Sequence, residues 1–187
     1  GRTYTLRISD LPSGRGDGVP FTSLVDLAKG AKLIHALSAP PESRWLVSTT
    51  VGYGLIAKCA DMVSRQRAGK AFMTVEDGQI PLPPVPTTGD WGAVAASNGK
   101  ALVFPIEEVK EGSGGKGVQL IKLDAGEQMM ALTVFDGQTL MVEGAGKGKR
   151  SGRLKLSGEN LDRYRFHRAK KGSLLEKGIV ASRLWTD

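Results

Sequence analysis

A loop rich in glycine and basic residues recurs four times along this 187-residue chain, each time after short apolar runs separated by turns. The copies span residues 12–18, 63–69, 110–117 and 164–172, and they close on Gly18, Gly69, Gly117 and Gly172, which are 51, 48 and 55 residues apart. A period of roughly 40–50 residues is typical of one four-stranded blade in a propeller-like array. The 25 glycines argue against a helix bundle and, being aperiodic, against collagen, so the repeat is expected to be built of strands.

Patterns within the repeats favour strands and tight turns. Alternating polar and apolar residues from Thr3 to Ile8 predict a half-buried strand. Short apolar runs predict further strands at 45–47, 55–57, 93–95, 102–104 and 132–135. The dipeptides Asn98-Gly99 and Asp136-Gly137 lie between such runs and favour two-residue hairpin turns, and Asp77-Gly78 marks a third turn. Single helical turns are expected only at 11–13, 60–64, 107–110 and 159–164.

These patterns together predict an all-β, propeller-like fold of four-stranded blades in one domain covering residues 1–187. About four blades are expected, with approximate limits 1–50, 51–98, 99–144 and 145–187. Each blade buries one face against its neighbours, so its stability depends on the adjacent blades.

The charge is unevenly distributed along the chain. The net charge is +7, but residues 1–144 carry 14 basic and 15 acidic side chains, whereas residues 145–187 carry 12 basic and only four acidic ones. The last quarter therefore contributes most of the positive field, and a polyanion is the expected partner. The alternative is a basic surface that serves solubility alone.

Recurring basic loops would fall at equivalent places on one rim of a propeller-like disc. Glycines let the backbone approach an anionic surface closely, and spaced cations on a curved rim suit the phosphates of a bent duplex, without base-specific contacts. The expected phosphate contacts are Arg15, Arg65, Arg67, Lys70, Lys116, Lys149, Arg153, Arg168, Lys170 and Lys171. Tyr164 and Phe166 are the only aromatic residues interleaved with these loops.

Other classes of function find little support. The longest apolar runs have four to six residues, too short for a membrane-spanning helix, and no secretory leader is visible. The single cysteine, Cys59, is expected to be a small core residue in a strand, and a cytoplasmic location is the simple interpretation. His35 and His167 have no catalytic or metal-binding partner at a recognised spacing, so no catalytic residue, metal site or cofactor is predicted.

Several motifs resemble the C-terminal domain of the A subunit of bacterial topoisomerase IV, a relative of the gyrase A C-terminal domain. They are Gly1-Arg2-Thr3-Tyr4 with residues 11–18, Gly52-Tyr53-Gly54 with residues 65–71, Leu102-Val103-Phe104-Pro105 ahead of Lys116-Gly117, and Arg153-Leu154-Lys155-Leu156 leading to residues 170–174. Four such pieces in order, at blade spacing, are specific together although each is weak alone. The resemblance extends over essentially the whole chain.

The resemblance implies a β-pinwheel, a disc whose blades exchange strands, with a basic outer edge that binds and bends double-stranded DNA. It also implies a non-catalytic part of an ATP-dependent type II topoisomerase that decatenates chromosomes and relaxes supercoils. The N-terminal breakage-reunion region of the same polypeptide would be one partner and a separate ATPase subunit the other, and ATP and Mg²⁺ would bind there rather than to this chain. One family blade would precede Gly1.

Two alternatives stay open at this point. Gyrase A C-terminal domains carry a Gln-Arg-Arg-Gly-Gly-Lys-Gly box, whereas residues 66–71 here are Gln-Arg-Ala-Gly-Lys-Ala, one residue shorter and with alanine for two glycines. This departure favours topoisomerase IV, with partial bending, over a gyrase domain that wraps DNA. The other alternative is a propeller-like protein-interaction module that binds an acidic partner.

Overall fold

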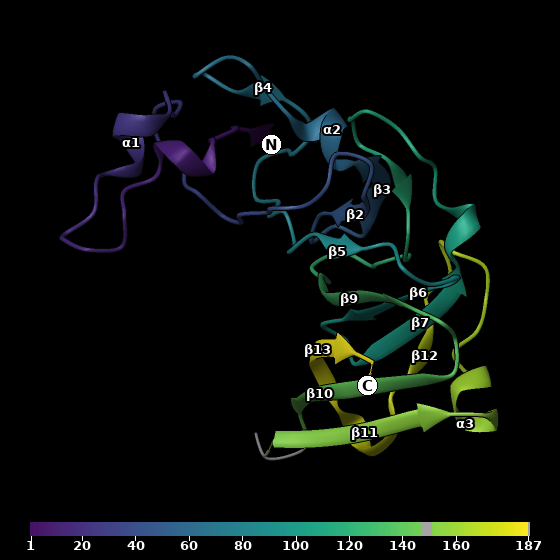
Figure 1. Ribbon diagram of the computed structural model, residues 1–187. Coiled ribbons are helices and arrows are strands. Elements are labelled where there is room, and N and C mark those ends of the chain that lie inside the picture. Colours follow the sequence, from purple (N-terminus) through teal and green to yellow (C-terminus); the bar gives the residue numbers. More distant parts are fainter. Residues whose placement is uncertain (147–150, 187) are drawn as a thin grey trace.

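The computed structural model describes residues 1–146 and 151–186, and strands are the dominant regular elements in them. They form two four-stranded antiparallel sheets, one three-stranded sheet and one two-stranded ladder. In Figure 1 the three larger sheets follow one another down the molecule in chain order. The predicted all-β fold with four-stranded units is confirmed.

The two-stranded ladder and the first large sheet contain strands from the first two thirds of the chain. The ladder joins β1 (Arg2–Thr3) to β4 (Lys70–Ala71). The first four-stranded sheet has the order β5-β2-β3-β8, with β5 at Val85–Pro86, β2 at Arg44–Ser48, β3 at Tyr53–Lys58 and β8 at Val118–Gln119.

The second and third large sheets contain the longest strands. The second has the order β12-β7-β6-β9, with β12 at Ser173–Leu174, β7 at Lys100–Pro105, β6 at Trp91–Ala96 and β9 at Met129–Phe135. The third has the order β11-β10-β13, with β11 at Ser151–Ser157, β10 at Thr139–Ala145 and β13 at Val180–Trp185.

Strands are exchanged between successive sheets. Strand β8 follows β6 and β7 in the chain, yet it pairs with β3 of the preceding sheet. Strand β12 follows β10 and β11 and pairs with β7 in the same way. The divisions expected after residues 50, 98 and 144 fall in the β2–β3 turn, in the β6–β7 turn and within β10. Each large sheet therefore draws strands from both sides of such a division.

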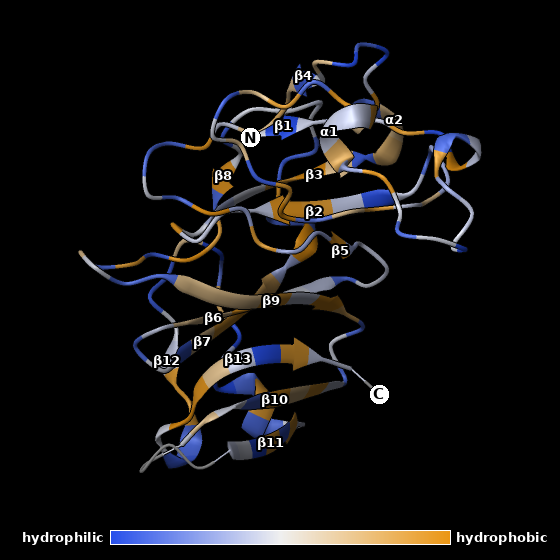
Figure 2. Cartoon of the chain, turned by 90° about the vertical axis from the view of Figure 1, so that its left-hand side faces the viewer, coloured by the Kyte–Doolittle hydropathy of each residue, from blue (hydrophilic) through white to orange (hydrophobic). Residues whose placement is uncertain are grey.

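The core lies mainly between neighbouring sheets. Phe104, Leu102 and Met129 belong to a buried cluster that joins the first and second sheets, and Leu140, Leu156 and Ile179 belong to one that joins the second and third. Figure 2 shows the sheets stacked on one another, with apolar stretches along their strands. Packing between sheets therefore holds the loops at their ends in place.

Short helical turns link the strands. They are η1 (Ile8–Asp10), α1 (Phe21–Leu24), α2 (Cys59–Met62), η2 (Ile106–Glu108), α3 (Glu159–Asp162) and η4 (Glu176–Gly178). Three of the four expected turns are therefore confirmed, but residues 11–13 form none. Cys59 begins α2 instead of lying in a strand. Within the described residues, the helices are too short and too polar to span a membrane.

The strand predicted from Thr3 to Ile8 is wrong. Only β1 pairs with another strand, and η1 begins at Ile8, whose side chain is 77% exposed. Alternation stabilises a strand only where a partner and a core lie beside it. In the described chain, residues 4–7 have no strand partner and none of them is fully buried, and Figure 1 shows the segment extending away from the large sheets.

Candidate nucleic-acid interface

The four basic loops close on glycines that all have left-handed backbone. Their φ angles are +74° at Gly18, +64° at Gly69, +76° at Gly117 and +70° at Gly172. A Cβ at Gly69, Gly117 or Gly172 would lie 2.1–2.3 Å from a backbone carbonyl oxygen of the preceding unit, a distance that no side chain can tolerate. Glycine is therefore required where these three loops approach the backbone of Thr3 in β1, Gly54 in β3 and Ala101 in β7.

Three of the loops are also bonded to the preceding segment in the same way. The residue two positions before the closing glycine accepts a backbone hydrogen bond in each case: Arg67 from Asp26, Gly115 from Thr74, and Lys170 from Lys122, at 3.0, 3.1 and 3.0 Å. The strand after the glycine then pairs with an earlier strand: β4 with β1, β8 with β3 of the β2–β3 hairpin, and β12 with β7 of the β6–β7 hairpin. Loops 63–69, 110–117 and 164–172 therefore occupy equivalent positions on successive units.

The first loop differs from the other three. A Cβ at Gly18 would meet nothing within 4 Å, and the loop makes no backbone bond to a preceding segment of the described chain. Arg15, in this loop, is exposed.

Each of the three equivalent loops carries a cation that is paired with a carboxylate of the preceding segment. Arg67 Nε lies 3.5 Å from Asp26 Oδ1, Lys116 Nζ lies 3.4 Å from Glu76 Oε1, and Lys171 Nζ lies 2.6 Å from Asp124 Oδ2. These side chains are all 46–62% exposed. The hydrogen bond with Lys171 lowers the pKa of Asp124, and the same bond raises the pKa of Lys171, so both groups are charged at neutral pH.

Arg168 is directed into the protein. Its guanidinium donates to the backbone oxygens of Glu108, at 2.8 Å, and Gln119, at 3.0 Å. Its own N–H donates to the Glu108 carboxylate. The structure thus gives Arg168 an internal role in attaching loop 164–172 to η2 and β8, while its predicted phosphate contact stays a prediction.

Glu108 also forms a hydrogen bond with His167, whose Nδ1 lies 2.5 Å from Glu108 Oε1. Burial of the Glu108 carboxyl favours its neutral form, but the hydrogen bonds from His167 and from the Arg168 N–H outweigh this effect and lower its pKa. Next to them, Tyr164 is buried in the core whereas Phe166 is 47% exposed. Of the two interleaved aromatic residues, only Phe166 is therefore accessible to a base.

The remaining predicted contacts differ in their surroundings. Arg153 on β11 lies opposite Glu143 on β10 and donates to its carboxylate at 3.0 Å. Lys149 lies outside the described residues. Arg15, Arg65, Lys70 and Lys170 have no hydrogen-bond or ion-pair partner for their side chains within residues 1–146 and 151–186, and all but the half-buried Lys70 are exposed.

Comparison with known proteins agrees with this architecture. The family profile described as the DNA gyrase C-terminal domain, beta-propeller, matches residues 1–40 and 94–136. The A subunit of DNA topoisomerase 4 from Neisseria gonorrhoeae is 41% identical over 182 residues, and that from Escherichia coli K12 is 31% identical over 183 residues, each match covering 94% of this chain. The solved E. coli ParC C-terminal domain superposes with a TM-score of 0.87 at 29% identity, covering 100% of this chain and 78% of that one.

The chain belongs to the family of C-terminal domains found in gyrase A and in the A subunit of topoisomerase IV. A solved DNA gyrase A C-terminal domain shares the fold, with a TM-score of 0.63 at 15% identity. The chain spans only 23% and 24% of the lengths of the N. gonorrhoeae and E. coli K12 relatives. The architecture described above is therefore that of a β-pinwheel domain of this family.

The carboxylates of the β-pinwheel domain were not among the predicted site residues. Asp26, Glu76 and Asp124 follow the closing glycines of the preceding loops by eight, seven and seven residues. That spacing was present in the sequence, but only the structure relates each acid to the cation of the next loop. Lys100 and Lys122, also outside the predicted set, lie close enough to Asp124 to contribute to its lowered pKa.

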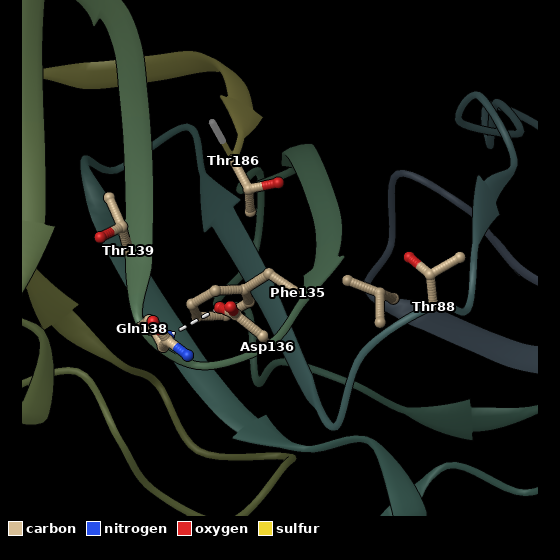
Figure 3. Close-up of a pocket in the computed structure, with 7 residues that line it drawn as sticks. Thr88, Phe135, Asp136, Gln138, Thr139 and Thr186 are labelled. Atoms are coloured by element: carbon tan, nitrogen blue, oxygen red, sulfur yellow. Dashed lines mark hydrogen bonds between the residues drawn. The ribbon is translucent and has the colours of Figure 1, made fainter.

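The pocket drawn in Figure 3 is lined by the neighbours of Gly137, whose carbonyl oxygen accepts a hydrogen bond from Arg165 of loop 164–172. It has a volume of about 380 Å³ and lies at the β9–β10 turn, where Asp136 accepts a hydrogen bond from the backbone N–H of Gln138. Its lining contains no cation and one carboxylate, and is formed by Thr88, Val134, Phe135, Asp136, Gln138, Thr139 and Thr186. Among the described residues, this lining therefore offers no positive charge to a phosphate, and the loops are the stronger candidate site.

Proposed function

We propose that this chain is the non-catalytic DNA-binding and DNA-bending domain of the A subunit of a topoisomerase IV, with duplex DNA lying along its basic loops. The observation that carries this proposal is the equivalent placement of loops 63–69, 110–117 and 164–172, each bonded by its backbone to the preceding unit. Exposed cations then recur once per unit along the domain. Such spacing suits contacts with successive phosphates of a curved duplex.

The chemistry of the loops favours phosphate contacts over base readout. Arg65, Lys70 and Lys170 offer charges without an internal partner in the described chain, and Phe166 is the one accessible aromatic side chain of its loop. Reading a sequence requires polar side chains that reach base edges in a groove. We therefore propose binding that is independent of sequence and that supplies duplex geometry to a separate catalytic region.

The wider assignment follows from the relatives. We propose that the domain acts with the breakage-reunion region of its own polypeptide and with an ATPase subunit, in the bacterial cytoplasm. Decatenation and supercoil relaxation would be activities of that assembly, which would bind ATP and Mg²⁺ outside this chain. The relatives named as A subunits of topoisomerase 4 support this assignment.

Titration of the chain with a labelled random duplex at several salt concentrations tests the proposal. Fluorescence anisotropy should show that the logarithm of the binding constant falls linearly with the logarithm of salt concentration, with a slope of about −0.9 per neutralised phosphate. Unrelated duplex sequences should give similar constants. A binding constant that does not change with salt, or no binding to duplex DNA, would contradict the proposal, and binding to acidic proteins instead would favour an interaction module.

A second candidate is the DNA-wrapping domain of gyrase A, which the matching family profile also includes. The two functions are separated by ligating a nicked circle in the presence of the chain. Wrapping traps writhe and shifts the distribution of linking number, whereas bending leaves it nearly unchanged. We expect little shift, because residues 66–71 depart from the glycine-rich gyrase box.

A further inference from the structure

The ion pairs at the basic loops recur at equivalent places in the repeat. Asp26, Glu76 and Asp124 each follow a closing glycine by seven or eight residues, and each pairs with the cation of the next loop. Those cations lie one or two residues before the next closing glycine. An arrangement repeated at three successive loops is a property of the repeat unit, not an accident of one loop.

Positioning of the loops does not require these pairs. The closing glycines and the backbone hydrogen bonds to Asp26, Thr74 and Lys122 already place the three loops. Ion pairs this exposed contribute little to folding stability, because water and salt screen them. Their effect therefore falls mainly on whatever else the three cations bind.

We propose that Asp26, Glu76 and Asp124 limit the affinity of the domain for DNA by holding loop cations that phosphates must capture from them. This inference rests on the proposed function. A phosphate that approaches Lys116 must replace Glu76 at a distance of 3.4 Å, and one that approaches Lys171 must replace Asp124 at 2.6 Å. Part of the binding free energy of each phosphate contact is then offset by the loss of an existing ion pair. The affinity of the domain for DNA is therefore lower, and the complex dissociates more readily.

Lys116 offers the clearest case for a test. Its Nζ lies 3.4 Å from Glu76 Oε1 and 4.8 Å from the centroid of the Tyr53 ring. Loss of the Glu76 charge would leave the ammonium group on the ring but free to face a phosphate. The neighbouring Asp77 is exposed and its side chain has no partner in the described chain, so it provides a matched control.

The experiment compares Glu76→Gln with Asp77→Asn in the salt titration described above. Both variants remove one negative charge from the same turn, so their long-range effects on DNA are alike. We expect Glu76→Gln to bind random duplex about two- to fivefold more tightly than Asp77→Asn at about 0.1 M salt. Asp124→Asn should increase the affinity at least as much as Glu76→Gln, because the pair of Asp124 with Lys171 is shorter than that of Glu76 with Lys116.

A double-mutant cycle shows whether the gain passes through the paired lysine. In the Lys116→Gln background, Glu76→Gln should have no more effect than Asp77→Asn, because no cation is left to release. Thermal melting of all variants verifies that they are folded. An equal gain in both backgrounds would indicate a general field effect and would overturn the inference.

The remaining outcomes are equally decisive. If the parental chain does not bind duplex DNA, the proposed function fails. If the parental chain binds but Glu76→Gln and Asp77→Asn behave alike, the function stands and the inference fails. If Glu76→Gln binds more weakly than Asp77→Asn, the carboxylates position the loops for DNA, which also overturns the inference.

Discussion

Basic side chains of the same loop differ in whether they bond within the protein or face solvent, and their charge alone does not distinguish the two cases. Arg168 and Lys170 lie two positions apart in one loop, yet the Arg168 guanidinium donates to two backbone carbonyls while Lys170 faces solvent without a side-chain partner in the described chain. The sequence predicts both as phosphate contacts, because a cation beside glycine looks the same in either role. Only the position of Glu108 and Gln119, about 50–60 residues earlier, separates the two.

Replacement of Arg168 by Gln should therefore lower stability. The backbone oxygens of Glu108 and Gln119 would lose charged donors, and we expect a decrease of about 1–3 kcal/mol in the free energy of unfolding. Denaturant unfolding measures this decrease. Lys170→Gln in the same loop is the control and should change stability by less than about 0.5 kcal/mol. Equal effects of the two substitutions would show that the internal bonds of Arg168 contribute nothing.

Glu108 makes stability depend on pH. Its carboxyl pKa is lowered in the fold, where hydrogen bonds from His167 and the Arg168 N–H outweigh the opposing effect of burial. A lowered carboxyl pKa contributes stability above the ordinary value of about 4.3, and this stability is lost as the pH falls through the folded-state pKa. The melting temperature of the parental chain should thus fall more between pH 5 and pH 3, as an approximate range, than that of Glu108→Gln. Parallel curves for the two proteins would contradict this assignment.

At the scale of elements, the positions of turns were predictable from the sequence, but the pairing of the strands on either side of them was only partly so. Asn98-Gly99 lies in the β6–β7 hairpin turn, with φ of +79° at Gly99, but three residues and not two separate the strands. The hairpin predicted at Asp136-Gly137 is wrong, because this turn joins β9 to β10, which lie in different sheets and do not pair in the described chain. The two-residue strands β8 and β12 carry no pattern of their own. They pair with β3 and β7 because the loops deliver them there, which is a consequence of packing between repeats.

The closing glycines provide a test of this strand exchange. A Cβ at Gly117 would lie 2.1 Å from the Gly54 carbonyl oxygen, so Gly117→Ala must separate β8 from β3. Gly126 is the control, because it has a similar φ of +81° but a Cβ placed there would meet no atom within 4 Å. Gly126→Ala should cost about 1–2 kcal/mol from its backbone conformation alone, and Gly117→Ala clearly more. Similar unfolding free energies for the two variants would argue against the close approach at Gly117.

At the scale of the molecule, the positive charge of the last quarter is partly neutralised within the fold. Arg153 pairs with Glu143, Arg163 with Glu176, and Lys171 with Asp124. The sequence predicts where basic residues are concentrated, but each pairing depends on which strands and loops the fold brings together. Cations without a partner in the described chain instead occur in several loops, as Arg15, Arg65 and Lys170 do. Their distribution along the stacked sheets matters more to the proposed binding than their number.

The most direct test of the account is to remove the same number of charges from the loops and from elsewhere. One variant replaces Arg65, Lys70 and Lys170 by Gln, and the other replaces Arg7, Lys29 and Lys32, which are exposed and lie outside the four loops. Both have the same net charge, so any difference in affinity reports position. The account predicts that the loop variant binds random duplex at least about tenfold more weakly than the other, because it lacks up to three phosphate contacts. Equal dissociation constants for the two variants would contradict it.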